Sequence, residues 1–447
     1  MLLSEQEEIE LGKNADAQIV QQYGIYDDQG LNQFVSDLGQ RMAKISHRPN
    51  LPYEFKILDT PVINAFAVPG GFVYVTRGIL AYLNSEAEFA GVMGHEIGHV
   101  TARHSAKQYS KAQLAQLGLG VGSILSEDFA QYAGLAQTGL ALLFLKFSRD
   151  AERQSDRLGV EYSTKVGYDA RKMASFFETL DRMSPGDEGG LPGWFSTHPA
   201  PEERVENIGT LAQEWQAKVQ TRNLEVNRDV YLRRISGLVY GNDPRQGYVE
   251  GNVFYHPQLR FQFPVPGGWK VNNTPSQVQI GTEEGSAAIL FTLASGKTPA
   301  QTSQKFLSES KATVVNSQNI DVHGFSTRRV ISDLNTQQGV LRVLSYFIHY
   351  GQNTYVFHGY TGQANFGSYQ STFQGTMNGF NKLNDPQKIN VSPKRVQIKK
   401  VNRRTTVQDA LTSFGVPDDK LEQTALLNGM KLTDSVERNG LLKIISD

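Results

Sequence analysis

The pattern of apolar and polar positions from residue 1 to about 245 is mostly that of helices. Two short runs near the start, Tyr53 to Leu58 and Phe66 to Val75, are typical of strands instead. Pro69-Gly70-Gly71 interrupts the second run, and such a break favours an edge strand or a bulge. We therefore expect residues 1–245 to form a mostly helical domain with a strand pair near its start.

The chain changes character after Gly241-Asn242-Asp243-Pro244, where alternating runs of β-forming residues begin. The predicted strands are Leu259 to Phe263, Ala287 to Leu293, Phe325 to Ile331, Leu341 to Tyr350 and Thr354 to Tyr360, and the predicted helices are Pro299 to Ser310 and Gly367 to Phe380. The last two strands, joined across Gly351-Gln352-Asn353, form the clearest hairpin. Residues 250–384 are expected to be an α+β sandwich domain, with one sheet covered on one face.

A further break at Asn384-Asp385-Pro386 leads to a short third domain, residues 390–447. In it, Arg395 to Val401 and Leu441 to Ile445 are predicted strands that flank two small helices. The basic run from Lys394 to Arg404 could bind an anionic polymer, but we interpret it as the solvated face of a strand. The fold class predicted for the whole chain is α+β multidomain.

The N-terminal residues predict a helix rather than a targeting segment. Ser4 and Glu7 form a capping box that opens an amphipathic helix towards Tyr23. The most apolar stretch, Leu135 to Phe147, is shorter than the roughly 20 apolar residues that a membrane-spanning helix needs. We expect a soluble chain whose export signal is absent from the sequence in hand.

The amino-acid composition limits the kinds of partner and of metal site that the chain can have. The 44 basic and 45 acidic residues nearly cancel, so the charge gives no support for a nucleic-acid partner. The chain has no cysteine, which excludes disulfides, thiol catalysis and cysteine-based metal sites. Any protein-bound metal must therefore be held by histidine, aspartate or glutamate.

A candidate metal motif follows a second predicted capping box, formed by Ser85 and Glu88. The helix that starts there runs into His95-Glu96-Ile97-Gly98-His99, where His95 and His99 project from one face, one turn apart. Glu96 is rotated by about 100° from His95, so it can hold a water beside the metal rather than ligate it. The alternative is an ordinary amphipathic helix with two surface histidines.

A catalytic zinc usually takes three protein ligands, so a third must be found. The extended three-histidine pattern would need His at position 105 and Gly at 102, but these are Ser105 and Ala102. His104 is one residue early and would point away from the metal on a continuing helix, so we expect it to make a surface contact or an outer contact to a ligand.

The other source of a third ligand is a carboxylate on a second helix. Glu152 and Asp156 are four residues apart and share one helix face, so Glu152 can ligate the metal while Asp156 accepts a hydrogen bond from a ligand histidine. The alternative is a charged helix surface with pairs among Arg149, Glu152, Arg153 and Asp156. The first motif favours the metal interpretation.

Two further segments carry candidate functional residues. His198 lies in a rigid turn before a helix, where it could donate to the oxyanion of a scissile carbonyl or block the open metal position. Arg204 follows one turn into that helix and could pair with a nearby carboxylate. Asn64-Ala65-Phe66-Ala67 could hold an extended peptide by β-augmentation, or simply be a core strand.

Together these motifs resemble the M48 family of zinc metallopeptidases, over about residues 1–210. The segments that carry the resemblance are His95-Glu96-x-x-His99, Glu152 with Asp156, Asn64-Ala65-Phe66-Ala67 with Pro69-Gly70-Gly71, and Ser196-Thr197-His198-Pro199. The resemblance implies a gluzincin fold with one Zn²⁺ per chain on His95, His99 and Glu152. It also implies that Glu96 is the base, Asp156 an outer partner, and His198 a transition-state or switch residue.

Membrane helices and tetratricopeptide repeats are not evident, so the chain is similar to the soluble periplasmic branch of that family, of the BepA and LoiP kind. The middle domain is similar to PsbP/Mog1-like domains on Phe261-Gln262-Phe263-Pro264 and Gly267-Gly268-Trp269, and the last to LysM-type modules on Leu427-Asn428-Gly429. We therefore predict a zinc metalloendopeptidase acting on unfolded or misassembled envelope proteins, periplasmic or outer-membrane-associated. Outer-membrane assembly machinery or peptidoglycan are the predicted partners besides polypeptide substrates. The alternative is a chaperone with a self-inhibited zinc site.

Overall fold

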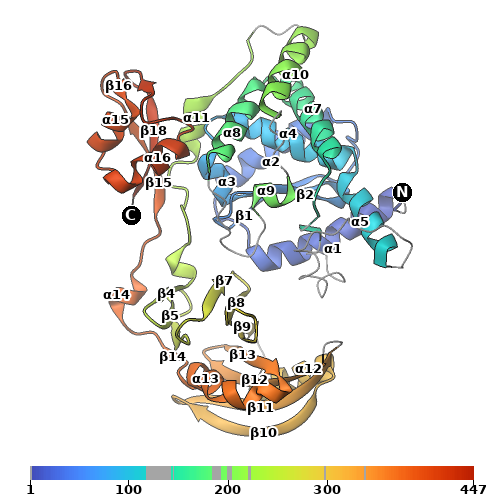
Figure 1. The fold of residues 1–447 in the computed structure, drawn as a ribbon, viewed down its shortest axis with the longest axis vertical. Helices are drawn as coiled ribbons and strands as arrows, with labels where there is room; N and C mark the ends of the chain where they lie inside the picture. Colours follow the sequence, from blue (N-terminus) through green and yellow to red (C-terminus); the bar gives the residue numbers. More distant parts are fainter. Residues whose placement is uncertain are drawn as a thin grey trace. The chain divides into compact units, whose positions relative to one another are not determined.

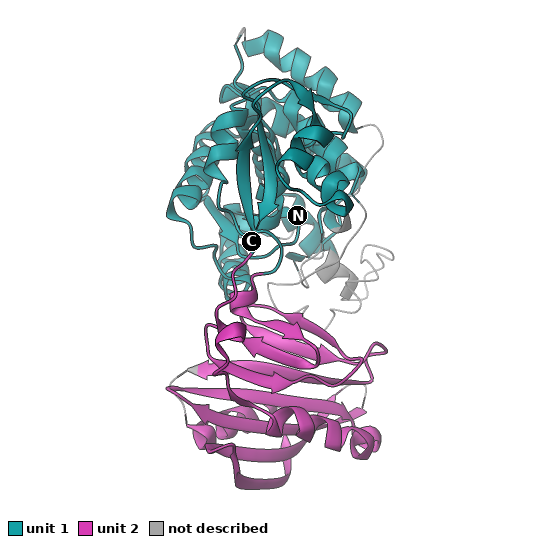
Figure 2. Ribbon diagram, turned by 90° about the vertical axis from the view of Figure 1, so that its left-hand side faces the viewer, with its two compact units in different colours: residues 1–242, 394–447 teal, residues 243–393 magenta. Residues whose placement is uncertain are grey.

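The computed structural model describes residues 3–116, 142–143, 145–183, 193–198, 204–219, 223–295, 298–336 and 339–446. The chain forms two compact units, residues 1–242 with 394–447 and residues 243–393 (Figure 2). The second unit is thus an insertion in the first, and the backbone N–H of Tyr240 donates to the carbonyl of Lys394 at 2.7 Å where the chain leaves and returns. Residues 394–447, predicted as part of a third domain, lie in the same compact unit as residues 1–242. The division into three domains remains a prediction.

The first unit begins with α1 (Glu5–Tyr23), capped by Ser4 and Glu7 as predicted, and α2 (Gln29–Lys44). A three-stranded sheet follows, with the order β1 (Glu54–Leu58), β3 (Phe72–Thr76), β2 (Ala65–Val68). The single interrupted strand expected from Phe66 to Val75 is wrong. The chain reverses at Pro69–Gly71, where Gly70 and Gly71 have φ values of 85° and 101°, so β2 and β3 pair as an antiparallel hairpin.

Helices make up most of the rest of this unit (Figure 1). They are α3 (Arg77–Tyr82), α4 (Glu86–Thr101), α5 (His104–Gln116), α7 (Arg149–Lys165), α8 (Arg171–Asp181), α9 (Trp194–Thr197), α10 (Arg204–Val219) and α11 (Arg228–Arg234). The side chains of α4 are buried from Glu86 to Val100, so this helix lies inside the core. At its start the Ser85 hydroxyl accepts from the Glu88 N–H, but the Glu88 carboxylate accepts from Asn84 N–H, so the predicted capping box is only half formed.

Residues 394–447 add a small α/β layer to the first unit. Strands β15 (Arg395–Lys400) and β18 (Leu441–Ser446) pair antiparallel and flank α15 (Val407–Ser413) and α16 (Leu421–Leu427), as predicted; β16 (Thr405–Thr406) and β17 (Ser435–Val436) form a second small pair. Val396, Leu427 and Leu441 belong to the same apolar core as α4. The buried Lys443 ammonium donates to the carbonyls of Ala81 and Leu83, just before α4 begins.

The second unit is built around a seven-stranded antiparallel sheet of order β10-β11-β12-β13-β9-β8-β7. Its strands are β7 (Lys270–Asn273), β8 (Gln277–Gly281), β9 (Ala287–Ser295), β10 (Thr313–Val322), β11 (Phe325–Thr336), β12 (Gly339–Tyr350) and β13 (Asn353–Gly362). A second sheet contains β4 (Tyr248–Glu250), β5 (Val253–His256), β6 (Phe261–Pro264) and β14 (Asn381–Lys382), and the helices are α12 (Pro299–Ser310), α13 (Phe366–Asn378) and α14 (Pro386–Ile389). The α+β class is confirmed.

The expectation that this sheet is covered on one face is wrong. Phe306 of α12 packs with Phe347 on one face of the sheet. Phe373 of α13 packs with Leu344 and Phe357 on the other face. Neighbouring residues of a strand point to opposite faces, so the apolar residues of β12 supply both layers.

Within the described residues, no helix combines the length and the apolar composition needed to cross a membrane.

Candidate metal centre

Helix α4 presents three side chains to the centre of the first unit. His95, Glu96 and His99 are each at most 1% exposed. The Nε2 atoms of His95 and His99 are 3.0 Å apart, because residues four apart lie on one helix face. Two imidazole nitrogens at this distance can share one proton or one cation.

Helix α7 brings Glu152 to this pair. Ser148 caps the helix by accepting from the Ala151 N–H. The Glu152 carboxylate lies with Oε2 3.5 Å from His95 Nε2 and Oε1 3.5 Å from His99 Nε2. Contact between α7 and α4 is close because Gly94 faces Gly159; a Cβ added to Gly159 would lie 2.9 Å from the backbone nitrogen of His95.

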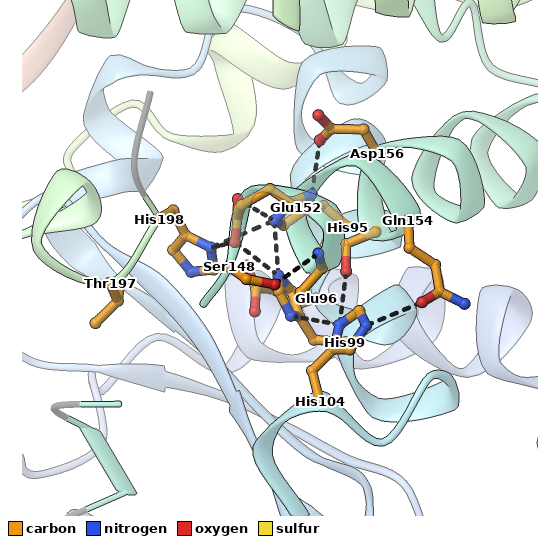
Figure 3. A network of polar contacts seen from close by, with 12 residues as sticks. His95, Glu96, His99, His104, Ser148, Glu152, Gln154, Asp156, Thr197 and His198 are labelled. Carbon is orange, nitrogen blue, oxygen red and sulfur yellow. Dashed lines mark hydrogen bonds and ion pairs between the residues drawn. The ribbon is translucent and has the colours of Figure 1, made fainter. Parts of the chain in front are cut away.

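His198 reaches the same point from the end of α9. Its Nδ1 lies 3.1 Å from Glu152 Oε1 and 3.4 Å from His95 Nε2 (Figure 3). The ring stacks on Trp194, with centroids 4.5 Å apart. Helix α9 is held by the bond from Trp194 N–H to the Ile63 carbonyl, and by the Thr197 carbonyl, which accepts from the Phe147 N–H. The predicted turn at Pro199 to Pro201 lies outside the described residues.

The donor set fits zinc. One ligand atom from each of His95, His99, Glu152 and His198 lies within 4.8 Å of the others. Neighbouring nitrogen and oxygen atoms of these four side chains are separated by 3.0 to 3.5 Å. Tetrahedral zinc with ligand bonds near 2.0–2.1 Å places its ligand atoms about 3.3 Å apart. Nitrogen and carboxylate donors at this spacing are what zinc selects in a protein without cysteine.

Glu96 lies beside these donors. Its Oε1 is 3.7 Å from His198 Nε2, and both atoms are buried without a hydrogen-bond partner among the described residues. Burial raises the pKa of the Glu96 carboxyl above its usual range. Burial opposes ionisation of Glu152 too, but His198 and His99 hold the pKa of Glu152 well below its usual value. The pKa values of the two carboxyls are therefore shifted in opposite directions, and Glu96 is the carboxyl that can take and return a proton.

Asp156 and Arg204 form an outer layer behind His95. Asp156 Oδ1 is 2.9 Å from His95 Nδ1. Arg204 donates to both oxygens of Asp156, at 2.6 and 2.9 Å, and its Nη1 is 3.3 Å from Glu152 Oε2. The guanidinium also covers the ring of Phe177. Arg204 thus pairs with two carboxylates of α7, and the roles of these residues in function remain predictions.

The expectation that His104 continues a helix and points away is wrong, but the outer contact to a predicted ligand, one of the two roles expected for it, is present. Helix α4 ends at Thr101, and Arg103 has a φ of 59°, so α5 starts at His104 in a new direction. His104 Nδ1 comes to 3.0 Å from His99 Nδ1, and its Nε2 to 3.1 Å from Gln154 Oε1. Burial lowers the pKa of His104 to about 4.

The segment Asn64 to Ala67 leads into and forms most of β2, an edge strand of its sheet. These side chains are buried, and the Ala67 carbonyl accepts from the Ser105 hydroxyl at the start of α5. The carbonyl of Ile63, just before this segment, is the one that anchors α9. Substrate binding by this strand remains a prediction.

Sequence reasoning missed several residues that contact the centre. Trp194 stacks on His198, Phe147 lies 4.1 Å from His99 between ring centroids, and Gln154 contacts His104. Gln154 lies two residues from both Glu152 and Asp156, a spacing that does not share their helix face, so no sequence signal singled it out. For Trp194 and Phe147 the sequence carries no motif.

Comparisons with known proteins agree with this geometry. A model of peptidase family M48 matches residues 31–212, which include every residue of the centre. The chain is 30% identical over 211 residues to metalloprotease YcaL of Escherichia coli K12, covering 44% of this chain and 79% of that protein. It is 29% identical over 253 residues to the beta-barrel assembly-enhancing protease of the same organism, covering 54% of this chain and 50% of that protein. The chain thus spans about half the length of that relative. The chain also has a weak structural similarity to the cyanobacterial PsbP protein of Synechocystis sp. PCC 6803, with 13% identity and a TM-score of 0.27 over 30% of this chain and 96% of that protein.

Proposed function

Because the chain belongs to peptidase family M48, we propose that it is a zinc-dependent metalloendopeptidase, with His95, His99 and Glu152 as zinc ligands and Glu96 as general base. The observation that carries the proposal is the buried set of donors at zinc spacing, with Glu96 Oε1 beside it, which has no hydrogen-bond partner among the described residues. An ordinary helix surface would not bury two histidines and two glutamates together without solvent or cation to satisfy them.

His95, His99 and Glu152 would hold zinc, which would supply Lewis-acid chemistry to a peptide carbonyl and to the attacking water. Glu96 accepts the proton of that water and delivers it to the nitrogen of the leaving amine. Asp156 accepts from His95 Nδ1 and so keeps the lone pair of Nε2 directed at the metal. Arg204 balances the charge of Asp156 and Glu152 inside the core.

The position of His198 Nδ1 beside Glu152 and His95 supports a blocked form of this centre, in which His198 would be a fourth ligand. A catalytic zinc keeps that position for water and substrate. Cleavage would then require the His198 side chain to leave that position. In an opened form the same ring could act as the oxyanion donor, the other role expected for it.

As substrates we propose unfolded or misassembled polypeptides of the bacterial envelope, met in the periplasm or at the outer membrane. The support is the name of the beta-barrel assembly-enhancing protease, and the edge strand β2 beside the centre, which can pair with an extended chain. The blocked centre also favours a second candidate, an assembly factor or chaperone that holds such chains and cleaves them rarely. Peptidoglycan binding by residues 390–447 remains a separate prediction.

The test measures zinc content by elemental analysis beside casein cleavage, with and without a chelator. We expect one zinc per chain and chelator-sensitive cleavage. Glu96→Gln should keep the zinc and lose cleavage, because the amide cannot take a proton, whereas Glu206→Gln on the exposed side of α10 should change neither. Zinc without cleavage in the unaltered chain would favour the assembly-factor candidate. Absence of zinc, or cleavage by Glu96→Gln, would contradict the proposal.

A further inference from the structure

We propose that His104 and Gln154 form a hydrogen-bonded relay that positions the ligand His99 for zinc. The proposal rests on the metal centre described above and assigns new residues to it. His104 is 5% exposed and does not belong to the four described residues whose ligand atoms lie together, so it acts through His99 and is a positioning residue.

The direction of the relay follows from the chemistry of its ends. Gln154 Oε1 is an acceptor, so the His104 Nε2 that lies 3.1 Å from it carries the proton. A neutral ring then leaves His104 Nδ1 as an acceptor, and it lies 3.0 Å from His99 Nδ1 and 3.3 Å from the Ser155 hydroxyl. His99 therefore carries its proton on Nδ1, and the lone pair of its Nε2 faces the other zinc ligands.

Both ligand histidines are held in this way by helix α7. Asp156 contacts His95 directly, and Gln154 contacts His99 through His104. The ligand Glu152 lies on the same helix (Figure 3). One helix thus sets the third ligand and the ring orientation of the other two. The charges differ: His95 has an ionisable partner neutralised by Arg204, whereas His99 has an uncharged one.

The backbone before His104 is shaped for this contact. Arg103 takes a left-handed conformation, with a φ of 59°, which residues other than glycine rarely adopt. The turn is fixed by an ion pair of 2.8 Å between Arg103 Nε and the buried Glu8, and by a bond from Arg103 Nη2 to the Leu3 carbonyl. Strained backbone of this kind persists where its surroundings hold it and is concentrated at functional sites. Here its consequence is that His104 turns back towards His99.

The test is the zinc affinity of the full chain, measured by competition with a chromophoric chelator at a fixed pH. His104→Ala removes the acceptor, and we expect zinc binding to weaken about 10- to 100-fold. His104→Asn keeps an acceptor oxygen near the position of Nδ1 and should restore binding to within about threefold of the unaltered chain. Gln154→Leu removes the partner that fixes the His104 tautomer and should give an intermediate loss.

Two controls separate positioning from general damage. Each metal-free variant should still unfold in one cooperative transition, although the loss of a buried side chain lowers its midpoint. His349→Ala, on an exposed position of β12, should bind zinc normally. If the unaltered chain binds no zinc, the proposed function itself fails. If it binds zinc and His104→Ala binds equally well, or His104→Asn is as weak as His104→Ala, the relay is overturned while the metal centre stands. Should His104→Ala not fold, the Asn and Gln154→Leu variants decide between these outcomes.

Discussion

At the scale of single residues, Glu96 and His198 face each other inside the centre. The atoms Glu96 Oε1 and His198 Nε2 lie 3.7 Å apart, and both side chains are buried. This position of His198 is compatible with two opposite roles for its ring. Its Nδ1 could block a bound zinc as a fourth ligand. After the centre opens, its ring could instead donate a hydrogen bond to an oxyanion.

His198→Ala distinguishes these roles. If His198 blocks the centre, the initial rate of casein cleavage should rise, because a closed state favoured by only about 1.4 kcal/mol already suppresses activity about tenfold. Zinc should remain on the other three ligands. Loss of an oxyanion donor instead lowers the rate, by about 100-fold or more. The double variant His198→Ala with Glu96→Gln is the control: it should be inactive if the gained cleavage comes from this centre.

At the scale of elements, the centre depends on how closely α4 and α7 approach. Gly94 and Gly159 face each other, so the two backbones can come near enough for Glu152 to reach both histidines. A Cβ on Gly159 would lie 2.9 Å from the nitrogen and 3.2 Å from the Cα of His95. Backbone atoms cannot swing aside as a side chain can, so one methyl group must separate the helices.

Gly159→Ala should therefore weaken zinc binding and lower the free energy of unfolding by about 1–3 kcal/mol, as overpacking does. Chelator competition and urea unfolding measure the two effects. Gly209→Ala in α10 is the matched control, because nothing lies within 4 Å of its added Cβ. That variant should keep its zinc affinity and gain up to about 1 kcal/mol, since alanine favours a helix over glycine. Equal behaviour of the two variants would contradict the role of this contact.

At the scale of the whole molecule, residues 394–447 share a compact unit with the segment that contains the metal centre. Lys443 is fully buried and donates to carbonyls before α4, and Arg228 donates to the Leu441 carbonyl. The second unit, in contrast, has an apolar core of its own. The chain leaves and returns through adjoining backbone, since Val396 N–H donates to the Leu238 carbonyl.

Two deletions test this organisation. Replacing residues 243–393 by a short glycine-serine linker should leave zinc content and cleavage close to those of the full chain, because the ends to be joined are already hydrogen-bonded. Removing residues 394–447 should instead give an unstable protein, because it exposes the core around Val396 and Leu441 and leaves buried carbonyls without the lysine. Thermal unfolding and elemental analysis report both outcomes. A stable, zinc-loaded protein without residues 394–447 would show that the C-terminal layer is dispensable.

The sequence by itself determined the local parts of this protein. Helix period placed His95 and His99 on one face with Glu96 beside them, capping residues marked the starts of α1 and α4, and alternation marked most strands of the seven-stranded sheet. These signals depend on a few neighbouring residues, so they can be recognised in the sequence. The M48 resemblance drawn from them is confirmed by the family match over residues 31–212.

Only the tertiary structure decided which distant segments meet and in what conformation. The return of His104 depends on a left-handed Arg103 that Glu8 holds from another helix, and no local pattern predicts a positive φ at an arginine. The place of His198 in the ligand set depends on the hydrogen bond that holds α9 to Ile63 and on the stacking of the His198 ring on Trp194. The joining of residues 394–447 to the first unit depends on the buried Lys443. Such contacts are selected by packing and by the satisfaction of buried polar groups across the whole fold, and that selection exists only once the chain is folded.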